Sequence, residues 1–380
     1  MTRLPTMNEA SALEDQLVLR ARRFLAEHVT PRLEAGEKPW HDAALCAGAA
    51  SAGIFGISVP TEFGGSGASF TCKARVVEVL AEADFGLAMA LINSHNTAEN
   101  IARNAHPDVA QRFVPEIVAG RMAGCTSLTE PGAGSDFAAI TTRATRIAGG
   151  WRLEGEKAWI INAVRTGVAV CYAQTEPGSG AAGIASFVVD AARAGFVRGG
   201  PITRALPALG TGSYRLDGYL ASDEELLAPA GQAFKRALTS INGARIYVAA
   251  MCNGMVAESL RVAAAYGRER KTFGAPLAGH QSWRFALADA SVDLEAARLL
   301  VYDAALRLDA GEDVQGAAAR AKIFATTMAH RQVGALLHCM GAAGFADRYP
   351  FLRHLESVQA AAFTDGSTEM LKERIARSFV

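Results

Sequence analysis

The spacing of apolar residues divides the chain into three regions. Residues 1–118 carry apolar side chains at helical spacing, interrupted once by the turn-forming segment PTEFGGSG at 60–67. Residues 119–222 carry short apolar or alternating runs, such as VAVCY at 168–172, separated by turns rich in Gly and Pro. Helical spacing returns from 223 to 380. The pattern predicts an α+β chain with an N-terminal helical domain, a middle antiparallel β domain and a C-terminal helical bundle, divided at those boundaries.

The most regular stretch of the chain begins at Trp283. Apolar residues recur there with alternating steps of four and three, at Trp283, Leu287, Ala290, Leu294, Ala297, Val301, Ala304 and Leu308. This spacing predicts one long amphipathic helix with a narrow apolar seam, as in a bundle. Further helical stretches at 236–270 and 315–340, and a last helix after Asp365, favour a four-helix bundle.

Composition excludes several classes of protein. Half of the 380 residues are hydrophobic, and Lys plus Arg equals Asp plus Glu at 38 each, so the chain has no basic field for nucleic acid. It has no run of 18 apolar residues that would span a membrane, and no apolar segment typical of a secretory signal near its start. The six cysteines are scattered without a CxxC pair, which indicates reduced thiols. We expect a cytoplasmic protein without a metal site.

Two segments of the middle region have candidate chemistry. CTSLTEPGAGSD at 125–136 is a glycine-rich turn with hydroxyl groups, either a tight loop between domains or a surface that approaches a planar polar ligand. It lacks the Gly-Lys-Ser/Thr of a phosphate-binding loop and the G-x-G-x-x-G of a dinucleotide fold. EGEKAWIIN at 154–162 places Trp159 in a β run, where it is either a core residue or a cofactor contact.

Two further segments lie in the C-terminal region. YGRERKTFGAPL at 266–277 clusters Arg and Lys beside a glycine turn, which suits pyrophosphate binding or simply a solvated helix end. FTDGSTEM at 363–370 contains Asp365, which has two interpretations. It is either the cap of the last helix or a carboxylate held against the apolar run 360–363 as a base.

Together, TEPGAGSD, EGEKAWIIN, YGRERKTFGAPLAGHQ, HCMGAAGF and TDGSTE closely resemble, in order and spacing, the acyl-CoA dehydrogenase family over nearly the whole chain. The resemblance implies that family's fold, with FAD held between the β domain and the C-terminal bundle. It implies oxidation of an acyl-CoA, or an acyl thioester on a carrier protein, to the trans-2-enoyl thioester. Electrons would pass from FAD to an electron-transfer flavoprotein. It also implies a homo-oligomer, most often a tetramer.

The resemblance assigns roles to individual residues. Cofactor contacts fall on Leu128, Thr129, Ser135, Trp159, Ile161, Arg270, Thr272, Phe273, Gln281, His338, Gly341, Ser367 and Glu369, of which Arg270, Thr272 and Phe273 would reach the FAD of a neighbouring subunit. Substrate contacts fall on Ser135, Arg245 and Gly366. Asp365 occupies the position of the catalytic base, which is usually glutamate. Some branches carry the base immediately before the residue matching Arg245, but Ala244 stands there and cannot take a proton.

Some positions depart from the family pattern and leave two other functions open. Ile161 replaces the hydroxyl residue that bonds flavin N5, which favours a flavin monooxygenase or oxidase on the same fold. His338 replaces the expected Gln, and Glu356-Ser357 replaces Arg-Asp. A non-catalytic subunit that binds FAD or an acyl thioester is the second alternative, with Asp365 acting only as a cap. The small residues Ala360 to Ala362 leave room for a branched or alicyclic acyl group.

Overall fold

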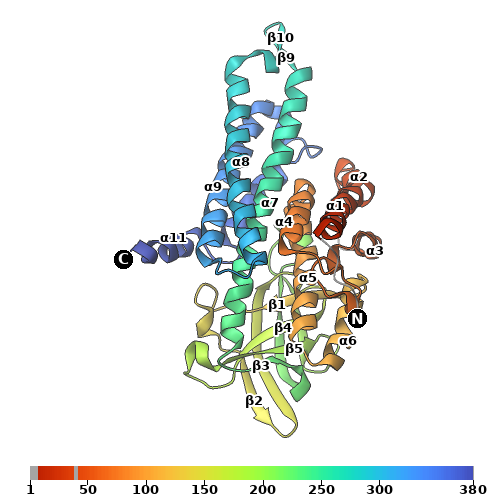
Figure 1. The fold of residues 1–380 in the computed structure, drawn as a ribbon, viewed down its shortest axis with the longest axis vertical. Coiled ribbons are helices and arrows are strands. Elements are labelled where there is room, and N and C mark those ends of the chain that lie inside the picture. Colours follow the sequence, from red (N-terminus) through yellow and green to blue (C-terminus); the bar gives the residue numbers. More distant parts are fainter. Residues whose placement is uncertain (1–6, 38–41, 380) are drawn as a thin grey trace. The chain divides into compact units, whose positions relative to one another are not determined.

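A computed structural model describes residues 7–37 and 42–379 of the chain (Figure 1). By contacts, the chain divides into two compact units, each assembled from separate stretches. The helical unit comprises Met1–Pro39, Ser69–Ala88 and Ile241–Val380. The sheet unit comprises Trp40–Ala68 and Met89–Ser240. Across the described residues, no helix is both long enough and apolar enough to cross a membrane.

The helical unit is built mainly from long amphipathic helices. Its elements are α1 (Met7–Phe24), α2 (Thr30–Glu34), α4 (Phe70–Ala83), most of α7 (Ala233–Glu269), α8 (Gln281–Asp309), α9 (Gln315–Met340), α10 (Phe351–Phe363) and α11 (Thr368–Ala376). Helices α8 and α9 lie side by side (Figure 1). The predicted seam of α8 is confirmed over its middle, where Ala290, Leu294, Ala297, Val301 and Ala304 are buried. Trp283, Leu287 and Leu308, toward the ends of the helix, are half-buried.

Helix α10 was not predicted from the sequence. Phe351, Leu355, Val358 and Ala362 recur there with helical spacing, which is the signal that could have predicted the helix, and its buried face also includes the polar His354 and Ser357. The helix packs on α9 and leads directly to the turn that contains Asp365.

The sheet unit contains α3 (Ala43–Ser51), most of α5 (Phe85–Asn104), α6 (Pro107–Val118) and an eight-stranded sheet. The strands are β1 (Ala123–Ser127), β2 (Arg143–Ile147), β3 (Gly150–Ile160), β4 (Thr166–Gln174), β5 (Ile184–Asp190), β6 (Phe196–Pro201), β7 (Gly212–Ser222) and β8 (Leu226–Ala228). Most neighbours pair antiparallel, as predicted, in the order β6-β7-β3-β2-β4-β5-β8. The exceptions are parallel pairings of β4 with β1 and, at one residue, with β2. A parallel pair needs a long connection, which the β2–β3 hairpin supplies between β1 and β4.

Strand β4 is buried on both faces of the sheet. Val168 and Val170 join one apolar cluster, which also contains Phe113 of α6, whereas Ala169 and Cys171 join the cluster on the other face. Successive side chains of a strand point to opposite faces, so a strand covered on both sides is apolar throughout. All six cysteines of the chain are free thiols, and four of them are buried, as the sequence indicated.

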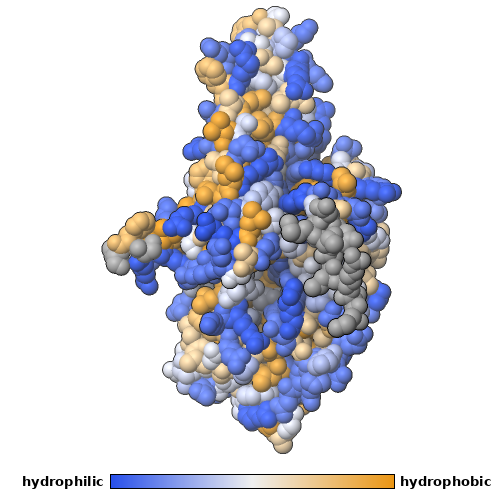
Figure 2. All heavy atoms as spheres, in the orientation of Figure 1, coloured by the Kyte–Doolittle hydropathy of each residue, from blue (hydrophilic) through white to orange (hydrophobic). Residues whose placement is uncertain are grey.

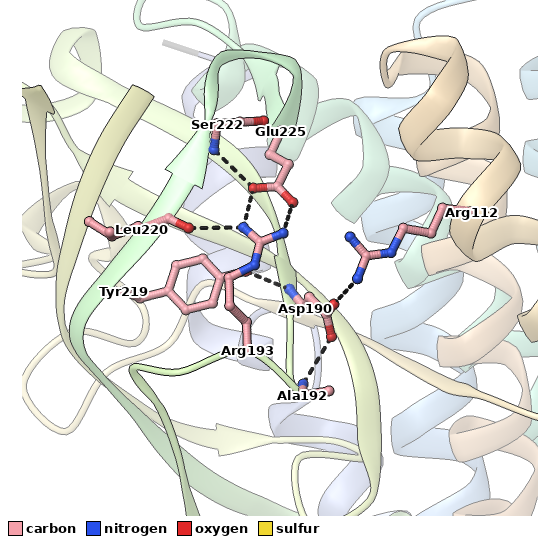
Figure 3. Close-up of polar contacts among 8 residues, drawn as sticks. All are labelled: Arg112, Asp190, Ala192, Arg193, Tyr219, Leu220, Ser222 and Glu225. Carbon is pink, nitrogen blue, oxygen red and sulfur yellow. Dashed lines mark hydrogen bonds and ion pairs between the residues drawn. The ribbon is translucent and has the colours of Figure 1, made fainter. Parts of the chain in front are cut away.

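A polar network connects α6 to one end of the sheet (Figure 3). Asp190, at the end of β5, forms an ion pair with Arg112 of α6, and its backbone N–H donates to the hydroxyl of Tyr219 at 2.8 Å. Arg193 donates to both carboxylate oxygens of Glu225 at 2.6 Å. The charged side chains of this network are hydrogen-bond partners of one another, so charge-assisted hydrogen bonds stabilise this corner of the sheet.

Candidate active site

The turn after α10 holds Asp365 in the left-handed region, with φ +57°. This conformation costs a non-glycine residue about 1–2 kcal/mol, although Asp tolerates it better than most. The N-cap of α11 is Ser367, whose Oγ accepts the N–H of Met370 at 3.4 Å. Asp365 therefore does not cap this helix, and among the described residues no group donates a hydrogen bond to its carboxylate.

Two buried cations bind the backbone of the same turn. Arg245 of α7 donates from Nε to the carbonyl of Asp365 at 3.0 Å. Lys322 of α9 donates from Nζ to the carbonyl of Gly366 at 2.5 Å. Burial raises the pKa of Asp365, and the charges of Lys322 and Arg245 oppose that rise without cancelling it. A carboxylate with a raised pKa is a stronger base.

In the sheet unit, the loop after β1 is fastened to β3. The N–H of Ala158 donates to the carbonyl of Thr129 at 3.1 Å, and Lys157 Nζ donates to the carbonyl of Leu128 at 3.2 Å. The next residue, Trp159, has φ +60° and is 57% exposed, so it is not a core residue. The structure thus brings Leu128 and Thr129 next to the end of β3 that carries Trp159.

A buried ion pair supports this loop. Lys157 Nζ lies 2.9 Å from Glu130 Oε1, and their side chains are only 1% and 3% exposed. Glu130 also accepts the backbone N–H groups of Thr141 and Thr142 at 2.7 and 3.0 Å. Burial by itself would raise the pKa of Glu130, but the charge and hydrogen bond of Lys157, with the threonine hydrogen bonds, lower it to about 2.

Asn162 fixes the far end of the same segment. Its side chain is fully buried, and Nδ2 donates to the carbonyls of Ala90 in α5 and Gly124 in β1 at 2.8 and 3.1 Å. Asn162 has φ +66°, which asparagine adopts more readily than most residues. Ile161 therefore lies between the exposed Trp159 and the anchored Asn162.

The remaining predicted cofactor residues of the helical unit lie elsewhere. Strands β9 (Lys271–Thr272) and β10 (Ala275–Pro276) form the hairpin between α7 and α8. Trp283 Nε1 donates to the carbonyl of Cys339 at 3.1 Å, which ties the start of α8 to the end of α9. The hairpin end thus holds Arg270, Thr272, Phe273, Gln281, His338 and Gly341.

Within one chain, this hairpin end is separate from the turn of Asp365. Sixteen residues of α9 separate Lys322 from His338, which corresponds to about 24 Å of helix. The structure groups Asp365, Gly366 and Ser367 with Arg245, and leaves Glu369 exposed in the first turn of α11 and Ser135 exposed in the sheet unit.

Family models match almost the full chain. The N-terminal, middle and C-terminal domain models of acyl-CoA dehydrogenase match residues 11–121, 125–218 and 231–380. A probable short/branched chain specific acyl-CoA dehydrogenase of Dictyostelium discoideum is 30% identical over 86% of this chain and 80% of the relative. The chain belongs to the acyl-CoA dehydrogenase family.

Solved structures of other proteins share the same three-domain fold. Butyryl-CoA dehydrogenase from Megasphaera elsdenii is 28% identical, with a TM-score of 0.90 and full coverage of both chains. A structure described as the electron transferring flavoprotein of Acidaminococcus fermentans is 29% identical, also with a TM-score of 0.90 and full coverage of both. As a member of this family of oxidoreductases, the chain has an N-terminal helical, a middle β and a C-terminal helical domain.

The acyl-CoA dehydrogenase family is FAD-dependent, and the residues of this chain fit that cofactor. The fit rests on Trp159, because a large aromatic ring held out of the core beside a polar loop provides a surface for a flat, partly polar ring system. In this arrangement Leu128 and Thr129 would also contact the ring system of the cofactor, and the side chain of Ile161 has no hydroxyl group to donate to it.

The Glu130–Lys157 pair makes the stability of this acyl-CoA dehydrogenase depend on pH. The folded-state pKa of Glu130, about 2, lies below the ordinary value of 4.5, so its contribution is present above pH 4.5 and is lost as the pH falls toward 2. Acidification from pH 5.5 to 3.5 should therefore lower the melting temperature of the wild type more than that of Glu130→Gln, measured by calorimetry. Parallel pH curves for the two proteins would contradict this assignment.

Proposed function

We propose that this chain oxidises a short or branched acyl-CoA to its trans-2-enoyl-CoA, with Asp365 as the base. The observation that carries the proposal is the state of that side chain. Asp365 is partly buried, its pKa is raised, and its carboxylate is neither a helix cap nor engaged by a described donor. A carboxylate in this state is suited to accept a proton from a weak carbon acid.

The carboxylate and the backbone N–H of Asp365 have separate roles in proton removal. The Asp365 carboxylate takes the proton from the α carbon, and the electron pair of that bond forms the new double bond. Among the described residues, the backbone N–H of Asp365 donates to no acceptor, so it is available to the thioester oxygen as negative charge develops there. When bound, FAD supplies the acceptor for the β-hydrogen, which leaves with its electron pair as hydride.

The substrate class follows from the chain and its relatives together. The relatives named above act, by their names, on short/branched-chain and butyryl thioesters. Ala360 and Ala362 precede the base turn, and their small side chains would leave space for a branch near the reacting carbons, whereas Ala361 is fully buried. CoA and a carrier protein both hold the acyl group on a pantetheine arm, so the proposal covers the thioesters of both. An electron-transfer flavoprotein is the proposed electron acceptor.

An oligomer is part of the same proposal. Phe273 at the hairpin tip is fully exposed with φ +49°, a strained and solvated position for an aromatic residue unless another subunit covers it. A second exposed set lies on α8, where Phe285, Val292, Leu299 and Leu306 recur every seven residues and are 57–71% exposed. Figure 2 shows apolar residues gathered along one flank of the helical bundle. A seven-residue apolar repeat is the pattern by which helices pair, which favours a homo-oligomer, a tetramer in our proposal.

Leu299→Asp tests this oligomer, because a carboxylate in the apolar repeat of α8 would be buried without a partner. We expect its mass in light scattering at micromolar concentration to fall from that of a tetramer to that of a dimer or monomer. Ser291→Asp is the matched control, since it adds the same charge on an exposed position of α8 outside the repeat. An unchanged mass for Leu299→Asp would exclude the repeat as an interface.

The activity is tested by anaerobic mixing of the FAD-loaded protein with straight, branched and alicyclic acyl-CoAs, following the flavin absorbance. Bleaching by one class of thioester supports dehydrogenation and identifies that class. Oxygen uptake in air at the same rate as substrate loss would instead support the oxidase that Ile161 favours. Bleaching by none of these thioesters would contradict the proposed function.

A further inference from the structure

Lys322 is an ammonium group placed in an apolar part of α9. Its side chain is 1% exposed, and Ala318, Ala319, Ala321 and Ala325 around it on the helix are all buried. A buried lysine is costly unless its N–H groups and its charge find partners. No acidic residue of α9 itself lies within four positions of Lys322, so its partners come from other segments.

The hydrogen bonds of Lys322 span the base turn. Nζ lies 2.5 Å from the carbonyl oxygen of Gly366 and 3.4 Å from that of Ala362. The first carbonyl follows Asp365, and the second belongs to the last turn of α10, where carbonyls have no partner within the helix. One ammonium therefore connects the two ends of the turn that presents Asp365.

The charges around Lys322 are few. The Asp365 carboxylate and the Cys252 thiol of α7 favour the charged form of Lys322, whereas the Arg245 guanidinium, which also lies on α7, disfavours it. Arg374 of α11 acts in turn on Arg245. Burial lowers the pKa of Lys322 to about 8, against the opposing effect of Asp365. Burial raises the pKa of the Asp365 carboxylate, and the ammonium charge of Lys322 opposes that rise.

We infer that Lys322 is the positioning residue of the base: it holds the turn 362–366 in place and keeps the Asp365 carboxylate ionised between turnovers. The inference rests on the proposed function, since it gives Lys322 a role only if Asp365 takes the proton. A purely structural alternative exists, in which Lys322 only satisfies the carbonyls at the end of α10. The two differ in one respect, because only the inferred role changes the pH at which Asp365 loses its proton.

Lys322→Gln separates the two roles, since it removes the charge and keeps N–H donors for the carbonyls. We expect the acid limb of the pH–rate profile for anaerobic flavin bleaching to move up by about one pH unit. At pH values well below the limb the rate would then fall roughly tenfold relative to the wild type, with recovery toward the wild-type rate above the limb. Lys322→Arg keeps the charge and should leave the limb in place. Arg320→Gln is the matched control, an exposed cation on the same helix, and should leave the profile unchanged.

Melting temperature and retained FAD are measured on each variant. A lower rate of Lys322→Gln at every pH, together with a lower melting temperature, would overturn the inference in favour of the structural role. An unchanged profile would overturn it as well. Should Lys322→Gln not fold, Lys322→Met provides the same charge removal and the same pH comparison. If Asp365→Asn bleaches like the wild type, the proposed function fails first, and that result is separate from any outcome at Lys322.

Discussion

Asp365→Asn should lower the rate of flavin bleaching by an acyl-CoA roughly 10²–10⁴-fold, because the amide cannot accept the α proton. The fold should be unaffected, since Ser367 rather than Asp365 caps α11. The measurement is stopped-flow mixing under anaerobic conditions, with FAD content and melting temperature recorded in parallel. Asp365→Glu, which restores the family's usual residue, should retain activity.

Glu356→Gln provides the control for this substitution. It neutralises an exposed carboxylate on α10, the helix that leads to the base turn. We expect wild-type bleaching from this control. Wild-type bleaching from Asp365→Asn would remove Asp365 from the chemistry and support a subunit that binds acyl thioesters without acting on them.

Lys157→Met should be the most destabilising single change in the sheet unit. It leaves Glu130 charged and buried without its cation, which costs about 3–5 kcal/mol, or roughly 6–20 °C in melting temperature for a unit of this size. The loop of Leu128 would also lose the hydrogen bond that fastens it to β3, so less FAD should be retained after gel filtration. Calorimetry and the flavin-to-protein absorbance ratio measure the two effects, with the exposed Lys235→Met as control.

The double variant Glu130→Gln/Lys157→Met identifies the cause of that loss. If the uncompensated charge of Glu130 dominates, removing it as well should restore part of the melting temperature. A double variant no more stable than Lys157→Met would show that the missing hydrogen bonds of the lysine dominate instead.

Regular apolar spacing made much of the fold predictable. The seam of α8 and the continuous apolar run of β4 correspond directly to the elements observed. Other parts were missed. The short helix α10 was not predicted, although Phe351, Leu355, Val358 and Ala362 have helical spacing. The parallel pairing of β1 with β4 depends on a contact between strands far apart in the sequence. The domain boundaries at 118 and 222 stay predictions.

The candidate site was likewise predictable from the sequence only in part. The resemblance pointed to Asp365 and Trp159, but it gave no role to Lys322 or to the Lys157–Glu130 pair. Lys322 left a signal in the sequence, because a lysine stands on the helical stripe of Ala318, Ala325 and Ala329, all of which are buried. The Lys157–Glu130 pair left none, since a strand residue and a loop residue 27 positions apart meet only after folding.

The order in which the chain is synthesised affects how the helical unit assembles. The start of α4 is held by Asp309 at the end of α8, which accepts the backbone N–H groups of Phe70 and Thr71 at 2.7 and 2.9 Å. On a ribosome that adds roughly 5–20 residues per second, α4 is made more than ten seconds before these acceptors exist. The part of its apolar face that α8 covers must stay exposed for that time, although α1 is already made and can cover another part. Newly made chains should therefore benefit from chaperones that protect such surfaces.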